Sequence, residues 1–494
     1  AMSLVRRSIC SPIKCRSHPN PILLHQYSSL QHPSKQSPRS QDAQHEFSLY
    51  FHYPYCNKLC PYCAFNKFQR DRSQNPSDFQ LLSAYECSLS KISQSSWYNN
   101  EIKGYPPNLR SVFFGGGTPS LGSPKMYEKL IGHILETFGD RTDEINSPDS
   151  ISDAVERNPT GETLSKSRCA NVEISMEMNP TLATPTTLKD MKLAGINRMS
   201  IGIQSLRDDD LKFLGREHSG KQALDILERA IKEYDGRVSA DLMFGTPSHH
   251  KSLDAFVEDS LRPILETGVR HISLYELTIQ KGTPFHKLYF HDKAHIMDDE
   301  QLASLYEACI ELCREYGLYQ YEVSNFAASP QDECRHNIAY WQGIDYIGLG
   351  PGAHSRLSNN DHTSRMEMVQ FAKPEDWHFE STTDSPVHSK MNELVNWGGN
   401  SKITPISPKQ RLNELVMVAL RMPRVGLSLQ KLRQHTNDSQ ASFFNNQYVN
   451  YSRIQDLIKE GLLNVVEDSG DLHLRATERG IKVLNGVLNE ILLD

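Results

Sequence analysis

Seven short apolar segments alternate with amphipathic stretches between residues 47 and 326, and this alternation constrains the fold more than any other feature. The apolar segments are 47–53, 111–115, 172–178, 198–204, 238–244, 271–277 and 319–326. Helical patterns fill the gaps, for example at 80–92, 127–138 and 301–317. Strands that alternate with helices form parallel sheets with right-handed crossovers. We therefore predict an α/β fold built on a TIM-like barrel or part of one.

The C-terminal part of the chain has a different pattern. The alternation stops near residue 375, and residues 375–407 read as an irregular connector. From residue 408 onward, helical segments are followed by two short strands and a last helix, which resembles a winged-helix module. Such modules often bind DNA, but this one lacks a basic recognition helix, so docking or covering a site is expected instead. The predicted domains are 47–375, with a polar insertion at 139–171, and 376–494.

The first 46 residues differ in composition from the rest. They are rich in serine and proline, carry six Lys and Arg residues, and contain no acidic residue before Asp42. This is the composition of an organellar transit peptide, so residues 1–46 are predicted to be a disordered segment that is cleaved. Residues 25–30 look like a mitochondrial cleavage neighbourhood, which favours the mitochondrion over the chloroplast. A basic tail without a targeting role is the alternative.

Charge and hydropathy argue against two classes of function. The formal net charge is −7 at pH 7, and no local basic patch is visible, so nucleic acid is not an expected partner. No stretch of about 18 or more apolar residues is present, so no membrane span is expected. Nothing in the pattern specifies an oligomeric state.

Three cysteines, Cys56, Cys60 and Cys63, lie directly after the first predicted strand. They are therefore expected on the loop at its carboxyl end, where barrel enzymes assemble their sites. Zinc is one alternative, with His52 or Cys87 as the fourth ligand. Chance proximity of three buried thiols is another. An iron–sulfur cluster fits better, because three thiolates bind three irons of a [4Fe–4S] cluster and leave the fourth for a ligand outside the chain.

The spacing Cys-x3-Cys-x2-Cys, within the segment LYFHYPYCNKLCPYCAFNK, resembles the radical S-adenosylmethionine (SAM) proteins, in particular the anaerobic coproporphyrinogen III oxidase family. The resemblance covers residues 47–355 and, more loosely, the C-terminal unit. It implies a partial (β/α)6 barrel, a [4Fe–4S] cluster on the three cysteines, and SAM chelated to the open iron. An electron from the cluster then cleaves SAM to methionine and a 5′-deoxyadenosyl radical.

The same resemblance assigns a set of residues near strand ends to SAM. They are Tyr50, Tyr62, Gly116, Gly117, Thr118, Glu177, Gln204, Arg216 and Asp241. The glycine segment would surround the methionine amino group, and Tyr62 would lie against the adenine. A carboxylate can bind hydroxyls or an ammonium, and an arginine can bind a carboxylate through two hydrogen bonds. Without the resemblance, the glycines could form a tight turn, Tyr50 could be a core residue, and Glu177 with Arg216 could be a structural ion pair.

Phe65 lies two residues after the third cysteine, where the oxidases carry a fourth cysteine. In this the chain is similar to the HemW-like haem chaperones, which keep the cluster and SAM but hand haem to acceptor proteins. An H-N-x-x-Y-W motif, associated with haem handling in that group, is formed by His336, Asn337, Tyr340 and Trp341. An imidazole can ligate haem iron and aromatic rings can pack on a porphyrin. A histidine packed in a loop is the alternative.

The resemblance thus favours a haem chaperone, with haem as cargo, an apo-haemoprotein as acceptor and a ferredoxin or flavodoxin as electron donor. The alternative is an oxygen-independent coproporphyrinogen III oxidase, which decarboxylates two propionates of its substrate to give protoporphyrinogen IX. A third possibility is a scaffold that carries a cluster without turnover. Binding of SAM would argue against the scaffold.

Overall fold

The computed structural model describes residues 46–71, 73, 75–99, 108–139, 172–246, 253–289, 297–359, 364–383, 397–436, 438–444 and 446–493. The predicted transit peptide lies outside the described residues, apart from Glu46, which begins the first strand. The predicted insertion also lies outside them, apart from Gly139 at the end of a helix. Both therefore stay predictions.

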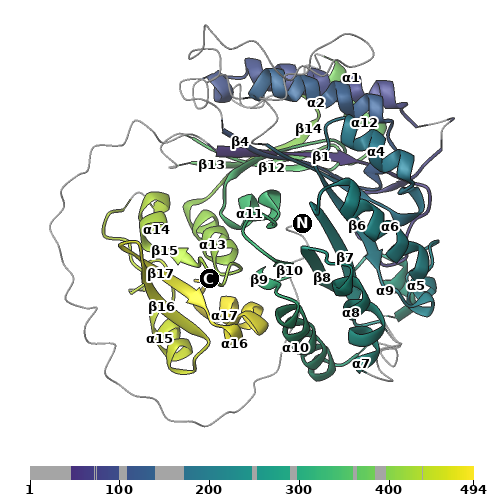
Figure 1. Cartoon of the computed structure of the whole chain (residues 1–494). Coiled ribbons are helices and arrows are strands. Elements are labelled where there is room, and N and C mark those ends of the chain that lie inside the picture. The colour runs from purple at the N-terminus through teal and green to yellow at the C-terminus, as the bar shows by residue number, and fades with distance from the viewer. Residues whose placement is uncertain are drawn as a thin grey trace, which may run out of the picture.

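Six parallel strands form the centre of the fold. In spatial order they are β1 (Glu46–Tyr53), β4 (Asn108–Gly116), β5 (Glu173–Met178), β6 (Arg198–Gln204), β7 (Val238–Phe244) and β8 (His271–Glu276). Each strand lies beside the one before it in this series, and helices connect them, so the sheet curves into part of a barrel (Figure 1). The predicted partial (β/α)6 barrel is confirmed.

The sheet continues on both sides, to twelve strands in the described part of the chain. Beside β1 lie the parallel strand β11 (Asp345–Leu349) and then the antiparallel strands β12 (His354–Ser358), β13 (Arg365–Gln370) and β14 (Asn400–Ile406). Beside β8 lie β10 (Asn325–Ala327) and β9 (Tyr319–Glu322). The antiparallel flanks keep the central parallel strands away from the open edges of the sheet.

Two predictions about these flanks were wrong. The sequence predicts one parallel strand at 319–326, but β9 and β10 form a hairpin that is antiparallel to β8. Apolar alternation does not separate one long strand from two short ones. The sequence also predicts an irregular connector at 375–407. In the structure, α12 (Pro374–Thr382) begins one residue before this range, and β14 lies inside it. Because β14 pairs with β13, the sheet continues past residue 375.

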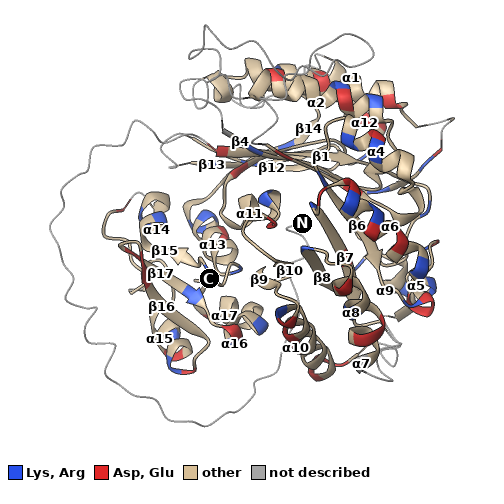
Figure 2. Cartoon of the chain, viewed as in Figure 1, with Lys and Arg blue, Asp and Glu red and all other residues tan. Residues whose placement is uncertain are grey.

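The connecting helices begin at clear caps. Ser77, Ser219 and Asp298 each accept a hydrogen bond from a first-turn N–H, and a glutamine three residues later closes a capping box. These caps begin α1 (Asp78–Gln94), α6 (Gly220–Glu233) and α10 (Asp299–Glu315). The other connecting helices are α2 (Pro124–Phe138), α4 (Pro185–Leu193), α5 (Asp208–Phe213), α7 (Leu253–Phe256), α8 (Arg262–Glu266) and α9 (Pro284–Tyr289). The charged residues of the outer helices lie in patches of both signs (Figure 2).

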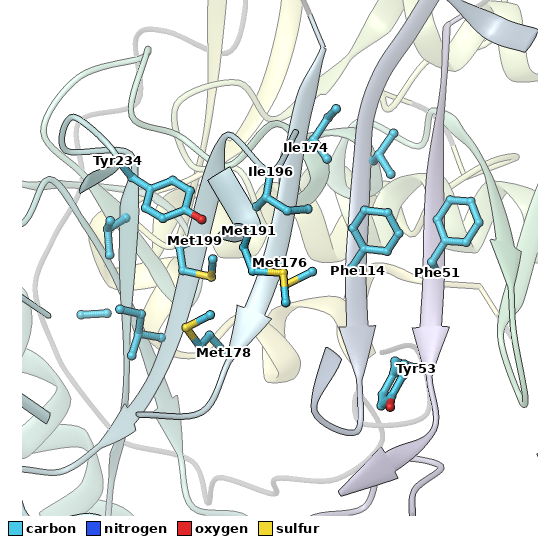
Figure 3. Close-up of a cluster of buried hydrophobic side chains, with 14 of the residues drawn as sticks. Phe51, Tyr53, Phe114, Ile174, Met176, Met178, Met191, Ile196, Met199 and Tyr234 are labelled. Atoms are coloured by element: carbon cyan, nitrogen blue, oxygen red, sulfur yellow. The ribbon is translucent and has the colours of Figure 1, made fainter. Parts of the chain in front are cut away.

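Every second side chain of the central strands is apolar and faces the outer helices. Phe51 on β1, Phe114 on β4, Met176 on β5 and Met199 on β6 lie in this layer, with Met191 of α4 beside them (Figure 3). All five are at most 2% exposed. Fully burying one such side chain contributes about 1.5–3 kcal/mol, so this layer is the main stabilising core.

The inner faces of the same strands carry small polar side chains. The inner serines are Ser48, Ser111, Ser175, Ser200, Ser239 and Ser273. Because serine is short, there is room for a helix inside the curve of the sheet. The helix α11 (Arg335–Trp341) fills it and contacts β1, β4 and β11 (Figure 1).

The C-terminal unit has a core of its own. Its helices are α13 (Pro408–Ala419), α14 (Leu429–Thr436), α15 (Tyr451–Lys459), α16 (Glu478–Lys482) and α17 (Leu484–Ile491), and its sheet consists of β15 (Leu427–Ser428), β17 (Asp471–Ala476) and β16 (Leu463–Asp468). This is the predicted order of helices and wing, except that the predicted last helix is broken at Val483. Within the described residues, no helix has the length and apolar character needed to cross a membrane.

Candidate functional site

The three cysteines lie on one loop at the carboxyl end of β1. The loop begins with β2 (Tyr55–Cys56) and ends with β3 (Phe68–Gln69), and these two short strands pair with each other. The Cys63 N–H donates to the Cys60 carbonyl at 3.3 Å, and the Lys67 ammonium donates to the Cys63 carbonyl. The sequence places the thiols at this end of the barrel, and the structure agrees.

The side chains around the three thiols would stabilise the negatively charged thiolate form. The Thr118 hydroxyl donates to Cys56 Sγ at 3.4 Å, and the Arg216 guanidinium donates to Cys60 Sγ at 3.6 Å. Burial raises the pKa of Cys56 to about 11 and raises the pKa of Cys63 as well. A bound metal would displace these protons, because coordinated thiols are deprotonated. Arg216 and Lys67 would then offset the added negative charge.

The donor set fits a cluster better than a single ion. Among the described residues, no group of three or more Cys, His, Asp or Glu side chains is placed to hold one metal ion. A [4Fe–4S] cluster does not need such convergence, because each thiolate binds a different iron. Zinc does need it, and His52, one of the two fourth ligands considered for zinc beside Cys87, has both ring nitrogens in hydrogen bonds.

The glycine segment ties the cysteine loop to the barrel. The Gly117 and Thr118 N–H groups donate to backbone carbonyls of the β1–β2 segment at 2.7 and 2.9 Å. Gly116 has a φ of +111°, and a Cβ at this position would lie 2.6 Å from the His52 ring, so glycine is required here. The glycine segment therefore forms a tight turn, as the alternative predicts. The contact of this segment with SAM stays a prediction.

Glu177 and Asp241 form an acidic pair on the inner face of the sheet. The Gly116 N–H donates to Glu177 Oε2 at 3.0 Å, and the Ser200 hydroxyl lies 2.9 and 3.0 Å from the two Asp241 oxygens. Burial and, to a smaller extent, the charge of Asp241 raise the pKa of Glu177 to about 8. Burial also raises the pKa of Asp241 to about 6. Two carboxyls in this state favour a cationic ligand.

Gln204 and Arg216 meet at Gly202. The pairing of β6 with β7 is irregular between Ile201 and Gln204, and Gln204 has a positive φ of 69°. A Cβ on Gly202 would lie 3.0 Å from the Gln204 amide nitrogen and 3.5 Å from Arg216 Nη2. Arg216 donates to the Gly202 carbonyl at 2.8 Å, whereas its Nε is buried without a hydrogen-bond partner. Among the described residues no ion pair joins it to Glu177, so that alternative was wrong.

A chain of hydrogen bonds that the sequence does not reveal connects the cysteine loop to the barrel interior. His52 Nε2 lies 2.6 Å from the Asn66 carbonyl, which can only accept, so Nε2 carries the hydrogen. Burial lowers the pKa of His52 to about 4, so the ring is neutral and Nδ1 accepts from the Tyr50 hydroxyl at 2.9 Å. The Asn66 amide donates to the Pro351 and Ala372 carbonyls. The signal in the sequence was the inner-face alternation of Tyr50 and His52.

Tyr62 packs on the side of the loop that faces α9. Its neighbours are a small apolar cluster of Leu214, Met243, Leu277 and Phe285. The Phe285 N–H donates to the Pro61 carbonyl at 3.1 Å, so the segment after β8 supports the loop. Burial raises the pKa of Tyr62, while Arg216 acts in the opposite direction. The contact of Tyr62 with adenine stays a prediction.

Helix α11 places the H-N-x-x-Y-W motif inside the barrel. His336 is 3% exposed and stacks on Phe113, with ring centres 4.7 Å apart, and on Tyr50 at 6.1 Å. Its Nδ1 lies 3.2 Å from Ser111 Oγ, and burial lowers its pKa to about 3, so the imidazole is neutral. His336 is thus packed, as the alternative predicts, but on a helix and not in a loop, and a porphyrin outside the barrel could reach it only after a movement.

The other three motif residues contact two different parts of the molecule, the barrel and the C-terminal unit. Asn337 and Tyr340 face the barrel, where the Asn337 amide lies 3.5 Å from the Tyr321 hydroxyl and the Tyr340 ring lies 4.4 Å from that of Tyr346. Trp341 faces the C-terminal unit, and the Arg421 guanidinium lies over its ring at 5.4 Å. The motif thus joins the barrel and the C-terminal unit.

A pocket beside the cysteine loop is lined by Cys60, Thr118, Asn179 and Arg216, among others. Of the residues predicted to contact SAM, Thr118 and Arg216 line this pocket. Glu177 and Asp241 lie deeper, on the inner face of the sheet.

The sequence matches two known domain families. Residues 50–260 match the radical SAM superfamily, and residues 406–483 match the HemN C-terminal domain. A relative from Danio rerio, radical S-adenosyl methionine domain-containing protein 1, mitochondrial, is 34% identical over 91% of this chain and 87% of that protein. The chain belongs to the radical SAM superfamily. Within this superfamily it belongs to the coproporphyrinogen III oxidase family, close to HemW, as the predicted resemblance states.

This radical SAM protein is also similar to a heme chaperone and to the solved structure of an oxidase. The heme chaperone HemW of Bacillus subtilis is 32% identical over 63% of this chain and 71% of that protein. The solved structure of coproporphyrinogen III oxidase (HemN) from Escherichia coli superposes with a TM-score of 0.62 and 18% identity, over 90% of each chain. At that identity the likeness shows the shared fold of the radical SAM barrel and its C-terminal unit.

Proposed function

We propose that this radical SAM protein is a mitochondrial haem chaperone of the HemW type, which binds a [4Fe–4S] cluster, SAM and haem, and transfers haem to acceptor proteins. The observation that carries the proposal is the cysteine loop. Three thiols lie at the carboxyl end of β1, and Phe65, with 49% of its surface exposed, stands where the oxidases have a fourth cysteine. Relatives named heme chaperone HemW, from Bacillus subtilis and Escherichia coli, support it.

Cys56, Cys60 and Cys63 would hold the cluster. When bound, the cluster supplies one electron for the cleavage of SAM. Arg216 and Lys67 would balance the negative charge of the thiolates, since they contact Cys60 Sγ and the Cys63 carbonyl. The β2–β3 pair holds the two ends of the cysteine loop together.

SAM would lie over the inner face of the sheet, between the cysteine loop and the acidic pair. Its sulfonium and ammonium groups are cationic, and Glu177 and Asp241 would attract them. Arg216 has a buried, unpaired Nε that can donate to the carboxylate of SAM. The remaining contacts would be made by Tyr50, Tyr62, Gly116, Gly117, Thr118 and Gln204.

Haem would be the cargo, an apo-haemoprotein the acceptor, and a ferredoxin or flavodoxin the electron donor. His336 of the H-N-x-x-Y-W motif is the proposed haem ligand, and Asn337, Tyr340 and Trp341 would support it. Relatives named for haem chaperone activity support this cargo.

The test uses anaerobically reconstituted full-length protein with reductant and SAM, divided between coproporphyrinogen III and haem. We expect no conversion of the porphyrinogen, and we expect stable haem binding that an apo-haemoprotein can withdraw. The His336→Ala variant should show an altered haem spectrum. Conversion of coproporphyrinogen III with release of carbon dioxide would overturn the proposal in favour of an oxidase.

The mitochondrion is the proposed compartment. Relatives from Danio rerio, Bos taurus, Mus musculus and Dictyostelium discoideum are named mitochondrial. The basic composition of residues 1–46 agrees with this. A reporter fused to these residues should enter isolated mitochondria and be shortened there. Import into chloroplasts alone would contradict the assignment.

A further inference from the structure

We propose that the C-terminal unit clasps the carboxyl end of α11, keeps Tyr340 against His336, and so controls access to this imidazole. The clasp consists of Arg421 and Lys431. The inference deepens the proposed function and rests on it, because haem binding by His336 is part of that proposal. The imidazole of His336 is 3% exposed, yet a haem ligand must reach a porphyrin, so this side chain must become accessible before haem can bind.

The amino end of α11 is firmly held by the barrel. The Arg335 N–H donates to Glu173 Oε1 at 2.9 Å, and Glu173 is 1% exposed. The same carboxylate lies 3.8 Å from the Arg198 guanidinium and 3.3 Å from that of Arg237. Pulling this end away would disturb a buried group of charges, which is costly. A movement that exposes His336 must therefore start at the other end.

The carboxyl end of α11 is held by two cations of the C-terminal unit. Arg421 lies over the Trp341 ring at 5.4 Å, and the Lys431 ammonium donates to the Gln342 carbonyl at the end of the helix. A cation over an indole and a cation at a helix carboxyl end are both favourable. However, Arg421 Nε is buried without a hydrogen-bond partner, which weakens this contact.

Tyr340 connects the clasp to His336. Its ring lies edge-on to the imidazole, with ring centres 4.9 Å apart, and it directly precedes Trp341 in the chain. The other groups beside the imidazole are Phe113 and Ser111 of β4 and Tyr50 of β1, and these strands cannot move away without opening the sheet. Fraying of the last turn of α11 would therefore move Tyr340 away and open one side of His336. The clasp opposes this fraying.

The experiment measures the accessibility of His336 without using haem. Full-length wild-type protein and the Arg421→Ala/Lys431→Met double variant are treated with diethylpyrocarbonate, and modification of His336 is followed by mass spectrometry. We expect about tenfold faster modification in the double variant, because local opening sets the rate. Hydrogen exchange of residues 335–342 should rise in parallel. Arg421→Lys keeps the charge but stacks less well, and should give a smaller increase.

The matched control is Lys482→Met, which removes an ion pair of 2.9 Å between Glu307 of α10 and the C-terminal unit, away from α11. It should label like wild type. Equal labelling of His336 in wild type, in the double variant and in Arg421→Lys would overturn the clasp. If the double variant does not fold, Arg421→Lys decides the question.

A haem titration of the same proteins separates the clasp from the proposed function. We expect faster haem association in the double variant, and we expect His336→Ala to abolish the increase. Faster labelling of His336 combined with haem binding that His336→Ala leaves unchanged would support the clasp and overturn His336 as the haem ligand.

Discussion

At the residue scale, the buried position of Glu177 changes the protonation state of its carboxyl group. Burial raises its pKa to about 8, so at pH 7 the proton is mostly retained. A cationic ligand prefers the ionised carboxylate, so binding of SAM at pH 6–8 must release a proton. The affinity for SAM should therefore rise with pH, by about tenfold per unit at most, and level off above about pH 8. Glu177→Gln should bind about tenfold or more weakly at pH 8 and lose most of this dependence.

Isothermal titration calorimetry across this pH range, in buffers of different ionisation enthalpy, would measure both the affinity and the released proton. Asp225→Asn, on the exposed side of α6, is the control and should behave like wild type. An affinity of the wild-type protein that does not change with pH would show that Glu177 does not titrate on binding.

Gly116 is a residue whose backbone and surroundings both exclude a side chain. Its φ is +111°, and a Cβ would lie 2.6 Å from the ring of His52, which holds the Asn66 carbonyl. Gly116→Ala should lower the free energy of unfolding by about 2–4 kcal/mol. Gly132→Ala, in the middle of α2 with no atom near the added methyl group, should be neutral or stabilising by up to about 1 kcal/mol. Urea unfolding would compare them, and equal effects would refute the steric argument.

At the scale of elements, the three thiols lie outside the main core cluster, although the strands that flank their loop contact it. These strands, β2 and β3, pair with each other, Tyr55 of β2 belongs to the main core, and Phe68 of β3 packs against it. Changing Cys56, Cys60 and Cys63 together to alanine should abolish bound iron and its visible absorbance. The far-ultraviolet circular dichroism should stay unchanged, with a loss of stability of about 1–3 kcal/mol from the one buried thiol. Iron retained by the triple variant would contradict the cluster assignment.

At the scale of the whole molecule, the C-terminal unit has enough buried apolar surface to fold without the barrel. Its core includes residues such as Phe443, Leu432 and Ile454, each 0% exposed. A fragment of residues 407–494, which starts at the N-cap of α13, should unfold cooperatively, with a stability on the order of 4 kcal/mol at about 0.05 kcal/mol per residue. Phe443→Ala should remove about 3–5 kcal/mol and leave the fragment largely unfolded. Thermal circular dichroism would measure both, and a gradual transition of the unchanged fragment would disprove its independence.

Local patterns were sufficient for the parts of the fold that depend on neighbours in sequence. Alternating apolar residues located the six central strands, and helical periodicity located α1, α2 and α10. A strand that buries one face repeats its apolar residues about every two positions, whereas a helix repeats them about every 3.6 positions. The same reasoning put Cys56, Cys60 and Cys63 on a loop at the carboxyl end of β1.

Tertiary structure decided what depends on partners far away in the chain. The sequence could not show that β9 and β10 fold back on each other, that β14 joins the sheet through β13, or that His52 pairs with Tyr50 and the Asn66 carbonyl. It also could not show that His336 lies inside the barrel. The polarity of a site and the pKa of Glu177 are set by groups brought together from separate strands, and only the assembled barrel creates that environment.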